Sequence, residues 1–170
     1  MSIISALVDH HGVLRQLYRK SETDPSLFEE FTRHLVVHHT MEEKYFYDYL
    51  ERVVEARHDA LEAVNEHHII ELIIKDAEGY PQDHEDFPIR IEGLGEYTIH
   101  HLDEEEMDIF PMAQQLFSAK DLDTLGRLFL EAKEKLLGVE LPEAPANISG
   151  GSQSIRQTSA YGLGIGSLKK

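Results

Sequence analysis

Two stretches of the chain decide its fold: RHLVVHHTMEEKYFYDYL at residues 33–50 and YTIHHLDEEEMDIFPMA at residues 97–113. They share the pattern H-x-x-x-E-E, which begins at His38 in the first stretch and at His101 in the second. Residues four apart lie on one face of an α-helix, so each imidazole and the carboxylate after it can reach a common metal ion. In the first stretch the pair falls within an otherwise apolar stripe, where polar groups are unfavourable without a partner.

The chain up to Gly138 has helical character, and we expect an all-α, up-down-up-down four-helix bundle with a short fifth helix. The long helices are predicted over residues 3–20, 25–57, 58–79 and 89–111, and the fifth helix over residues 118–138. Gly79 suits a left-handed position after a helix, and Pro111 should kink or end the fourth helix.

The composition restricts the function. Lys+Arg is 16 and Asp+Glu is 32, so 16 − 32 gives a net charge of −16, which argues against binding to nucleic acids or anionic membranes. The absence of cysteine excludes disulfides, thiolate metal sites and cysteine nucleophiles. The 11 histidines among many carboxylates favour hard-to-borderline metals. We find no signal peptide and no apolar span of ~18 residues, and therefore expect a cytoplasmic protein.

Histidines occur as adjacent pairs on all four expected long helices, at positions 10/11, 38/39, 67/68 and 100/101. Neighbouring residues on a helix point about 100° apart, so one member of each pair can face the bundle centre. The spacing alone does not choose between them. A ferritin-like site would need Glu-x-x-His on two helices, and the one match, Glu55 to His58, falls at a helix break.

These features resemble the hemerythrin-like, HHE cation-binding family over residues 7 to about 137. The resemblance is carried by Asp9-His10, by the two H-x-x-x-E-E motifs, by EHHIIELII at residues 66–74 and by SAKDLDTLGRLFLEAK at residues 118–133. It implies a non-haem di-iron centre, oxo- or hydroxo-bridged, inside the bundle.

Carried over residue by residue, the resemblance implies that His10 and His38 hold one iron, that His67 and His101 hold the other, and that Glu42 and Glu105 bridge the pair. The adjacent copies His11, His39, His68 and His100 are then expected behind the ligands or at the surface. Oxygen-carrying members have a further histidine where this chain has Glu71, which is either a ligand or a surface residue. A carboxylate ligand there would lower the iron potential and favour redox turnover or sensing over reversible oxygen carriage.

The family also implies binding of O2, NO or peroxide, in protection against oxidative or nitrosative stress. Two alternatives stay open: a di-iron ferroxidase or oxidase for encapsulated iron storage, and a non-catalytic metal or oxygen sensor. The sequence leaves open whether the chain forms a homodimer.

The composition changes after residue 138, with Pro142 and Pro145 followed by a Gly/Ser-rich run. We divide the chain into a bundle at 1–138, a flexible linker at 139–161 and a terminal peptide at 162–170. The ending LGIGSLKK resembles peptides that load cargo into encapsulin nanocompartments, which implies an encapsulin shell as partner and location. The expected shell-targeting residues are Leu163, Ile165, Gly166, Ser167 and Leu168.

Overall fold

The structure is a computed structural model that describes residues 1–135, and every regular element in this range is helical. The elements in chain order are α1 (Ile3–Thr23), η1 (Pro25–Leu27), α2 (Phe28–Glu42), η2 (Glu43–Tyr47), α3 (Asp48–Leu50), α4 (Arg57–Glu78), α5 (Phe87–Glu104), η3 (Glu105–Ile109), α6 (Phe110–Leu116) and α7 (Ala119–Glu134). The elements η2 and η3 are π-helical turns. None of the helices in this part of the chain is long and apolar enough to cross a membrane.

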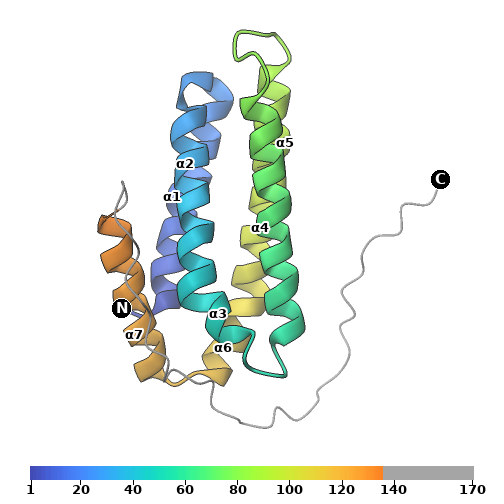
Figure 1. Cartoon of the computed structure of the whole chain (residues 1–170). Helices are drawn as coiled ribbons and strands as arrows, with labels where there is room; N and C mark the ends of the chain where they lie inside the picture. Colours follow the sequence, from blue (N-terminus) through green and yellow to red (C-terminus); the bar gives the residue numbers. More distant parts are fainter. Residues whose placement is uncertain (136–170) are drawn as a thin grey trace, which may run out of the picture.

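Four helical arms form a bundle: α1, the run from α2 to α3, α4, and the run from α5 to α6. Figure 1 shows α1 beside α2 and α4 beside α5, with α7 on the outer side of the first pair. Further contacts between α1 and α5, and between α2 and α4, close the ring of helices. The predicted all-α bundle with a short fifth helix is therefore confirmed.

Polar side chains cap two of the helical segments whose starts the sequence predicts. The Ser118 hydroxyl accepts a hydrogen bond from the Asp121 N–H at the start of α7, and Asp24 accepts one from the Ser26 N–H before η1. Such caps satisfy backbone N–H groups that have no partner within the helix, and each contributes about 1 kcal/mol. The expected end of the last helix at Gly138 lies outside the described residues.

The second and fourth arms differ from the uninterrupted helices expected. The run predicted over 25–57 passes through η2 and ends at Leu50. In the fourth arm, η3 comes directly before Phe110 and Pro111, and the Phe110 N–H bonds to the Glu105 carbonyl five residues back. Proline has no N–H to donate and crowds the preceding turn, and the wider π turn accommodates it. Pro111 is therefore the second residue of α6, where the sequence predicted a kink or an end.

Gly79 ends α4 as predicted, but in a right-handed conformation, with φ −76° and ψ −7°. Its N–H bonds to the Lys75 carbonyl and the Tyr80 N–H bonds to the Ala77 carbonyl, so the chain leaves the helix through one more right-handed turn. The predicted left-handed conformation is wrong.

The fifth helix packs tightly on the start of α1. At Gly126 of α7, a Cβ would lie 2.3 Å from the Met1 carbonyl oxygen, so only glycine permits this approach. Phe129 and Leu125 of α7 are buried in the same contact region. As a result α1 has two buried sides, one toward the bundle centre and one toward α7.

The apolar core consists of two clusters separated by a polar layer. One cluster surrounds the first half of α1 with η2, α6 and α7, and includes Leu7 and Phe46. The other surrounds the second half of α1 with the start of α2 and α5, and includes Leu14 and Phe31. The layer between them contains buried histidines and glutamates: His10, His11, His38, His39, Glu42, His67, His101 and Glu105.

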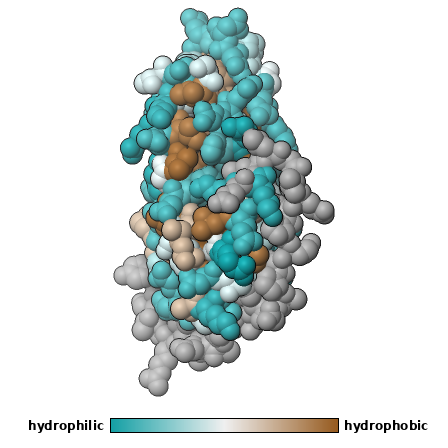
Figure 2. All heavy atoms as spheres, turned by 90° about the vertical axis from the view of Figure 1, so that its left-hand side faces the viewer, coloured by the Kyte–Doolittle hydropathy of each residue, from teal (hydrophilic) through white to brown (hydrophobic). Residues whose placement is uncertain are grey.

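The outer surface is polar by comparison. Figure 2 shows that the face at the left of Figure 1 is mainly hydrophilic, with apolar side chains in small separate groups. The histidine and glutamate layer, by contrast, is enclosed in the bundle.

Candidate metal centre

Each of the four arms contributes a histidine to the middle of the bundle. His11 comes from α1, His38 from α2, His67 from α4 and His101 from α5, and their side chains are at most 1% exposed. The carboxylates come from the two motifs: Glu42 is the last residue of α2 and Glu105 the first of η3. Both motifs thus place their glutamate where an α-helix passes into a π turn, a local geometry frequent at functional sites.

Each carboxylate oxygen of Glu105 lies close to a histidine ring nitrogen. Its Oε2 atom is 3.3 Å from His11 Nε2, and its Oε1 atom is 3.3 Å from His101 Nε2. Glu42 lies close to the other two histidines. Its Oε2 atom is 3.3 Å from Nε2 of His38, on the same helix, and 3.6 Å from Nε2 of His67, on α4. Glu105 therefore presents a different oxygen to each of two histidines, as a bridging ligand would, whereas Glu42 presents one oxygen to both of its histidines.

These donors form two groups whose ligand atoms lie within 4.8 Å of one another. The first group is His11, His38, Glu42 and Glu105, and the second is Glu42, His67, His101 and Glu105. The two groups share both carboxylates. Two adjacent cations with two common carboxylates would fit this arrangement.

The atoms that face the shared space have no hydrogen-bond partner. They are Nε2 of His11, His38, His67 and His101, both carboxylate oxygens of Glu42, and Oε2 of Glu105. An unpaired buried polar group costs about 1–3 kcal/mol, so a fold that collects several at one point needs a compensating ligand. Neutral imidazole and carboxylate are suitable donors for Fe, Mn, Co, Ni, Cu or Zn, and the residues present thus fit a metal.

The opposite ring nitrogen of three of these histidines bonds to a carboxylate. The pairs are His11–Glu106 at 2.8 Å, His67–Glu43 at 2.9 Å and His101–Glu66 at 2.7 Å, each through Nδ1. A proton on Nδ1 leaves the Nε2 lone pair free for a metal, so these contacts select the metal-binding tautomer and hold the ring in place. Arg15 in turn bonds to Glu106 at 2.6 Å. The contacts of Glu43 and Glu106 each join two helices, so the roles of these glutamates depend on packing between helices.

His38 has a different neighbour. Its Nδ1 atom lies 3.1 Å from Nδ1 of His10, so one imidazole donates to the other. The His10 ring also packs edge-on against His34 and Phe129. Burial, and then the charge of Lys133, lowers the pKa of His10 to about 3, so it is a neutral partner for His38.

Burial keeps most of the layer neutral in the absence of metal. It lowers the pKa of His38 and His39 well below the usual value, and it raises the pKa of Glu42 well above, with the charge of Glu105 acting in the same direction. Burial would also lower the pKa of His101, but Glu105, Glu66 and Glu42 outweigh it and raise that pKa to about 10.

Glu105 is the anionic partner of that charged histidine. Its burial would raise its pKa, but the positive charge of His101, whose Nε2 atom lies 3.3 Å from Glu105 Oε1, holds the pKa well below the usual value. Because a metal ligand must be a neutral imidazole, metal binding at this point would release the proton of His101.

Tyr47 makes a further contact with the same carboxylate. Its hydroxyl donates a hydrogen bond of 2.6 Å to Glu105 Oε1. Burial, and then the charges of Glu105 and Glu42, raises the pKa of Tyr47 well above its usual value, so it remains a donor. The contact with Glu105 depends on the π turn that carries the tyrosine.

The structure brings together five of the seven predicted ligands: His38, Glu42, His67, His101 and Glu105. His10 is not among the grouped donors, and its neighbour His11 occupies the α1 position. Because α7 buries a second side of α1, both histidines are enclosed, but His10 faces α2 and α7 while His11 faces Glu105. On α1 the geometry therefore favours His11 over the predicted His10.

Glu71 also stays outside the groups found among residues 1–135. The buried stripe of α4 runs through His67, Ile70 and Ile74, and Glu71 lies at its border, half-exposed. The predicted role of Glu71 as a ligand thus has no geometric support. His68 and His100 are exposed, as expected of the adjacent copies.

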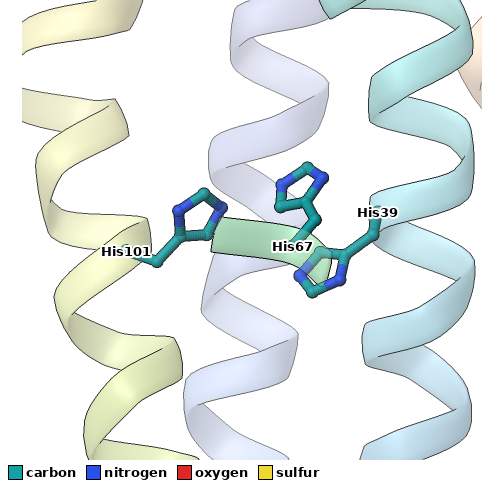
Figure 3. Close-up of side chains that lie close together, drawn as sticks. All are labelled: His39, His67 and His101. Atoms are coloured by element: carbon teal, nitrogen blue, oxygen red, sulfur yellow. The ribbon is translucent and has the colours of Figure 1, made fainter. Parts of the chain in front are cut away.

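His39 is a histidine of the layer that the sequence did not place there. Its ring is 1% exposed, and a ring nitrogen lies within 4.8 Å of ligand atoms of His67 and His101. Figure 3 shows the three rings coming together from three helices. Apart from its place beside His38, nothing in the sequence predicts that His39 is buried, because its side of α2 is covered by α4 and α5.

A helical bundle with a buried histidine and glutamate layer defines a class of cation-binding proteins, and the comparisons agree. The model of the family named Hemerythrin HHE cation binding domain matches residues 2–113, and the chain belongs to this family. The predicted hemerythrin-like family is therefore confirmed, and with it the binding of metal cations by this kind of domain.

A solved structure has a similar fold. It is the crystal structure of a hemerythrin HHE cation binding domain-containing protein from Mycobacterium kansasii, with a TM-score of 0.71 and 22% identity. The match covers 80% of this chain and 87% of that chain. At this identity the likeness concerns the fold alone. No curated protein matches the chain significantly.

Proposed function

We propose that the chain is a non-haem di-iron protein that binds O2, NO or peroxide and protects the cell from oxidative or nitrosative stress. The observation that carries the proposal is the pair of donor groups sharing Glu42 and Glu105, with their unpartnered lone pairs turned inward. Imidazole and carboxylate donors without thiolate suit iron, and two adjacent irons supply reversible electron transfer and a coordination position for a small ligand.

The chain's own residues would hold that pair and limit what reaches it. His11 and His38 would hold one iron, His67 and His101 the other, with Glu42 and Glu105 between them. Glu43, Glu66 and Glu106 would fix three imidazoles, and their negative charge would offset part of the cationic charge of the metals. The apolar clusters on either side of the layer favour a small, uncharged ligand.

Two other functions are compatible with this donor set. A ferroxidase or oxidase would turn over iron at the same centre, and a metal or oxygen sensor would bind without turnover. The enclosed, carboxylate-bridged position between four helices favours a resident metal pair over a passing iron substrate, and we therefore put ligand binding first.

We further propose that the chain is cargo of an encapsulin nanocompartment in the cytoplasm. The support is the sequence of the terminal peptide, in which Leu163, Ile165 and Leu168 alternate with small residues. Gly164 and Gly166 would let the backbone lie close to a shell wall. The peptide and the linker before it lie outside the described residues. Association of two copies of the chain into a homodimer is left open.

Iron loading and spectroscopy test the central proposal. The full chain, reconstituted with Fe(II) without oxygen, should hold about two irons and develop a visible charge-transfer band on exposure to O2 or NO. One iron or none, or a spectrum insensitive to both gases, would contradict the assignment. Sustained consumption of added Fe(II) would favour the ferroxidase alternative.

Co-expression with an encapsulin shell tests the cargo proposal. Leu168→Asp should abolish co-purification with the shell, because a charge in an apolar pocket costs a few kcal/mol. Leu141→Asp is the matched control, since it makes the same change outside the terminal peptide. Loading that survives Leu168→Asp and deletion of residues 162–170 would place the address elsewhere.

A further inference from the structure

We propose that His39 is a third imidazole ligand of the metal held by His67 and His101, an inference that rests on the proposed metal pair. His39 follows His38 directly on α2, so adjacent residues of one helix would serve the two metals. Glu71, the additional ligand expected on α4, lies outside both groups of donors. His39 would therefore supply a further ligand from α2 in its place.

The first support is that neither ring nitrogen of His39 has a partner. Both Nδ1 and Nε2 are buried without a hydrogen bond. In His11, His67 and His101, Nδ1 bonds to a carboxylate and only Nε2 is left over. A neutral imidazole enclosed in this way leaves both an N–H and a lone pair unsatisfied, which is unfavourable unless something binds the lone pair.

The second support is position. Ring nitrogens of His39, His67 and His101 lie within 4.8 Å of one another, which is short enough for one ion to collect them after small side-chain rotations. Figure 3 shows the rings converging from α2, α4 and α5. Glu105 Oε1 borders the same space, at 3.3 Å from His101 Nε2 and 3.9 Å from His67 Nε2.

A competing explanation is that His39 only packs against His67. The two rings are stacked, with centroids 4.0 Å apart and an angle of 7° between their planes. Two stacked parallel imidazoles do not direct lone pairs at one point, so His39 must turn about its side-chain bonds to ligate. Ligation uses the nitrogens of His39, and stacking uses only its face.

The proposal makes the two metals unequal. One would have two imidazoles, His11 and His38, and the other three, His39, His67 and His101, with Glu42 and Glu105 common to both. Glu71 would then be dispensable for metal binding.

The decisive substitution is His39→Phe, which retains an aromatic face and removes both nitrogens. Co(II) serves as the probe, titrated into the full metal-free chain. We expect the wild type to bind two Co(II) ions, and His39→Phe to bind one of them at least tenfold more weakly with an altered visible d–d spectrum. His68→Phe is the matched control on an exposed member of another pair and should leave both affinities unchanged. Unchanged affinities and spectrum in His39→Phe would overturn the proposal and favour stacking.

A measurement on the wild type covers the case in which the variant does not fold. Two-bond 1H–15N spectra of the Zn(II)-loaded protein should show a metal-bound nitrogen on His39 in addition to those of His11, His38, His67 and His101. A spectrum in which the other four are ligated and His39 is not would refute this inference and leave the proposed function standing. A wild type that binds no Co(II) or Zn(II) would refute both.

Discussion

Replacing Glu42 by leucine should stabilise the metal-free protein and remove its response to metal. Glu42 is 0% exposed, its two carboxylate oxygens have no hydrogen-bond partner, and burial raises its pKa well above the usual value. The metal-free fold therefore contains a buried carboxyl group without a hydrogen-bond partner, and a bound metal ion would supply the missing interaction. Glu42→Leu keeps a side chain of similar size and removes both unpaired oxygens.

The magnitude follows from those two oxygens. Relieving an unsatisfied buried polar group gains about 1–3 kcal/mol, and for a domain of this size each kcal/mol raises the Tm by roughly 3–5 °C. The metal-free Tm of Glu42→Leu should thus rise by several degrees. The wild type should gain about 2.7 kcal/mol when free metal is 100 times its Kd, and the variant should gain little of this, because Glu42 faces both donor groups.

Thermal unfolding followed by circular dichroism, with a chelator and with saturating Co(II), measures both effects. Glu71→Leu is the control, because the same change at a half-exposed position outside the groups should leave the metal-induced rise intact. Glu42→Gln separates the causes, since an amide leaves unpaired polar atoms and should not stabilise the metal-free fold. If the metal-free Tm of Glu42→Leu falls, or its metal-induced rise persists, the reasoning about Glu42 is wrong.

Three further predictions concern the histidine layer. With a chelator present, the free energy of unfolding should fall as the pH rises from about 6.5 toward 10, because the pKa of His101 is raised to about 10 in the folded state and its proton is lost over that window. Bound metal should remove this pH dependence. A Tm that rises over the same pH range in chelator would contradict the prediction. His11→Ala should abolish binding of one metal ion, whereas His10→Ala should weaken that binding about 10–100-fold, as expected for loss of a group that orients a ligand. Equal losses of affinity in the two variants, measured by calorimetry, would reject the preference for His11 over His10 as the ligand from α1. Glu66→Gln should lower metal affinity by a similar 10–100-fold through His101, and an unchanged competition titration against a chelator would show that this contact is dispensable.

The sequence by itself determined the helices and the kind of chemistry. The spacing from His38 to Glu42, and from His101 to Glu105, placed each pair on one helical face whatever the packing, because i and i+4 are neighbours on any α-helix. The predicted start of the fifth helix at residue 118 is also local, because the Ser118 side chain caps the helix that follows it directly. The family likewise depends on residues in order along the chain, and the family match agrees with that order.

Only the tertiary structure decided which member of a histidine pair points toward the buried glutamates. Adjacent residues point about 100° apart, and an extra helix on the outside of α1 enclosed both His10 and His11, so burial did not distinguish them and direction did. The same holds for His39, whose burial depends on α4 and α5, and for Glu43 and Glu106, which meet their histidines across helices. Contacts between helices depend on rotation about each helix axis and on the neighbours that the bundle supplies, and no local spacing in one sequence fixes either.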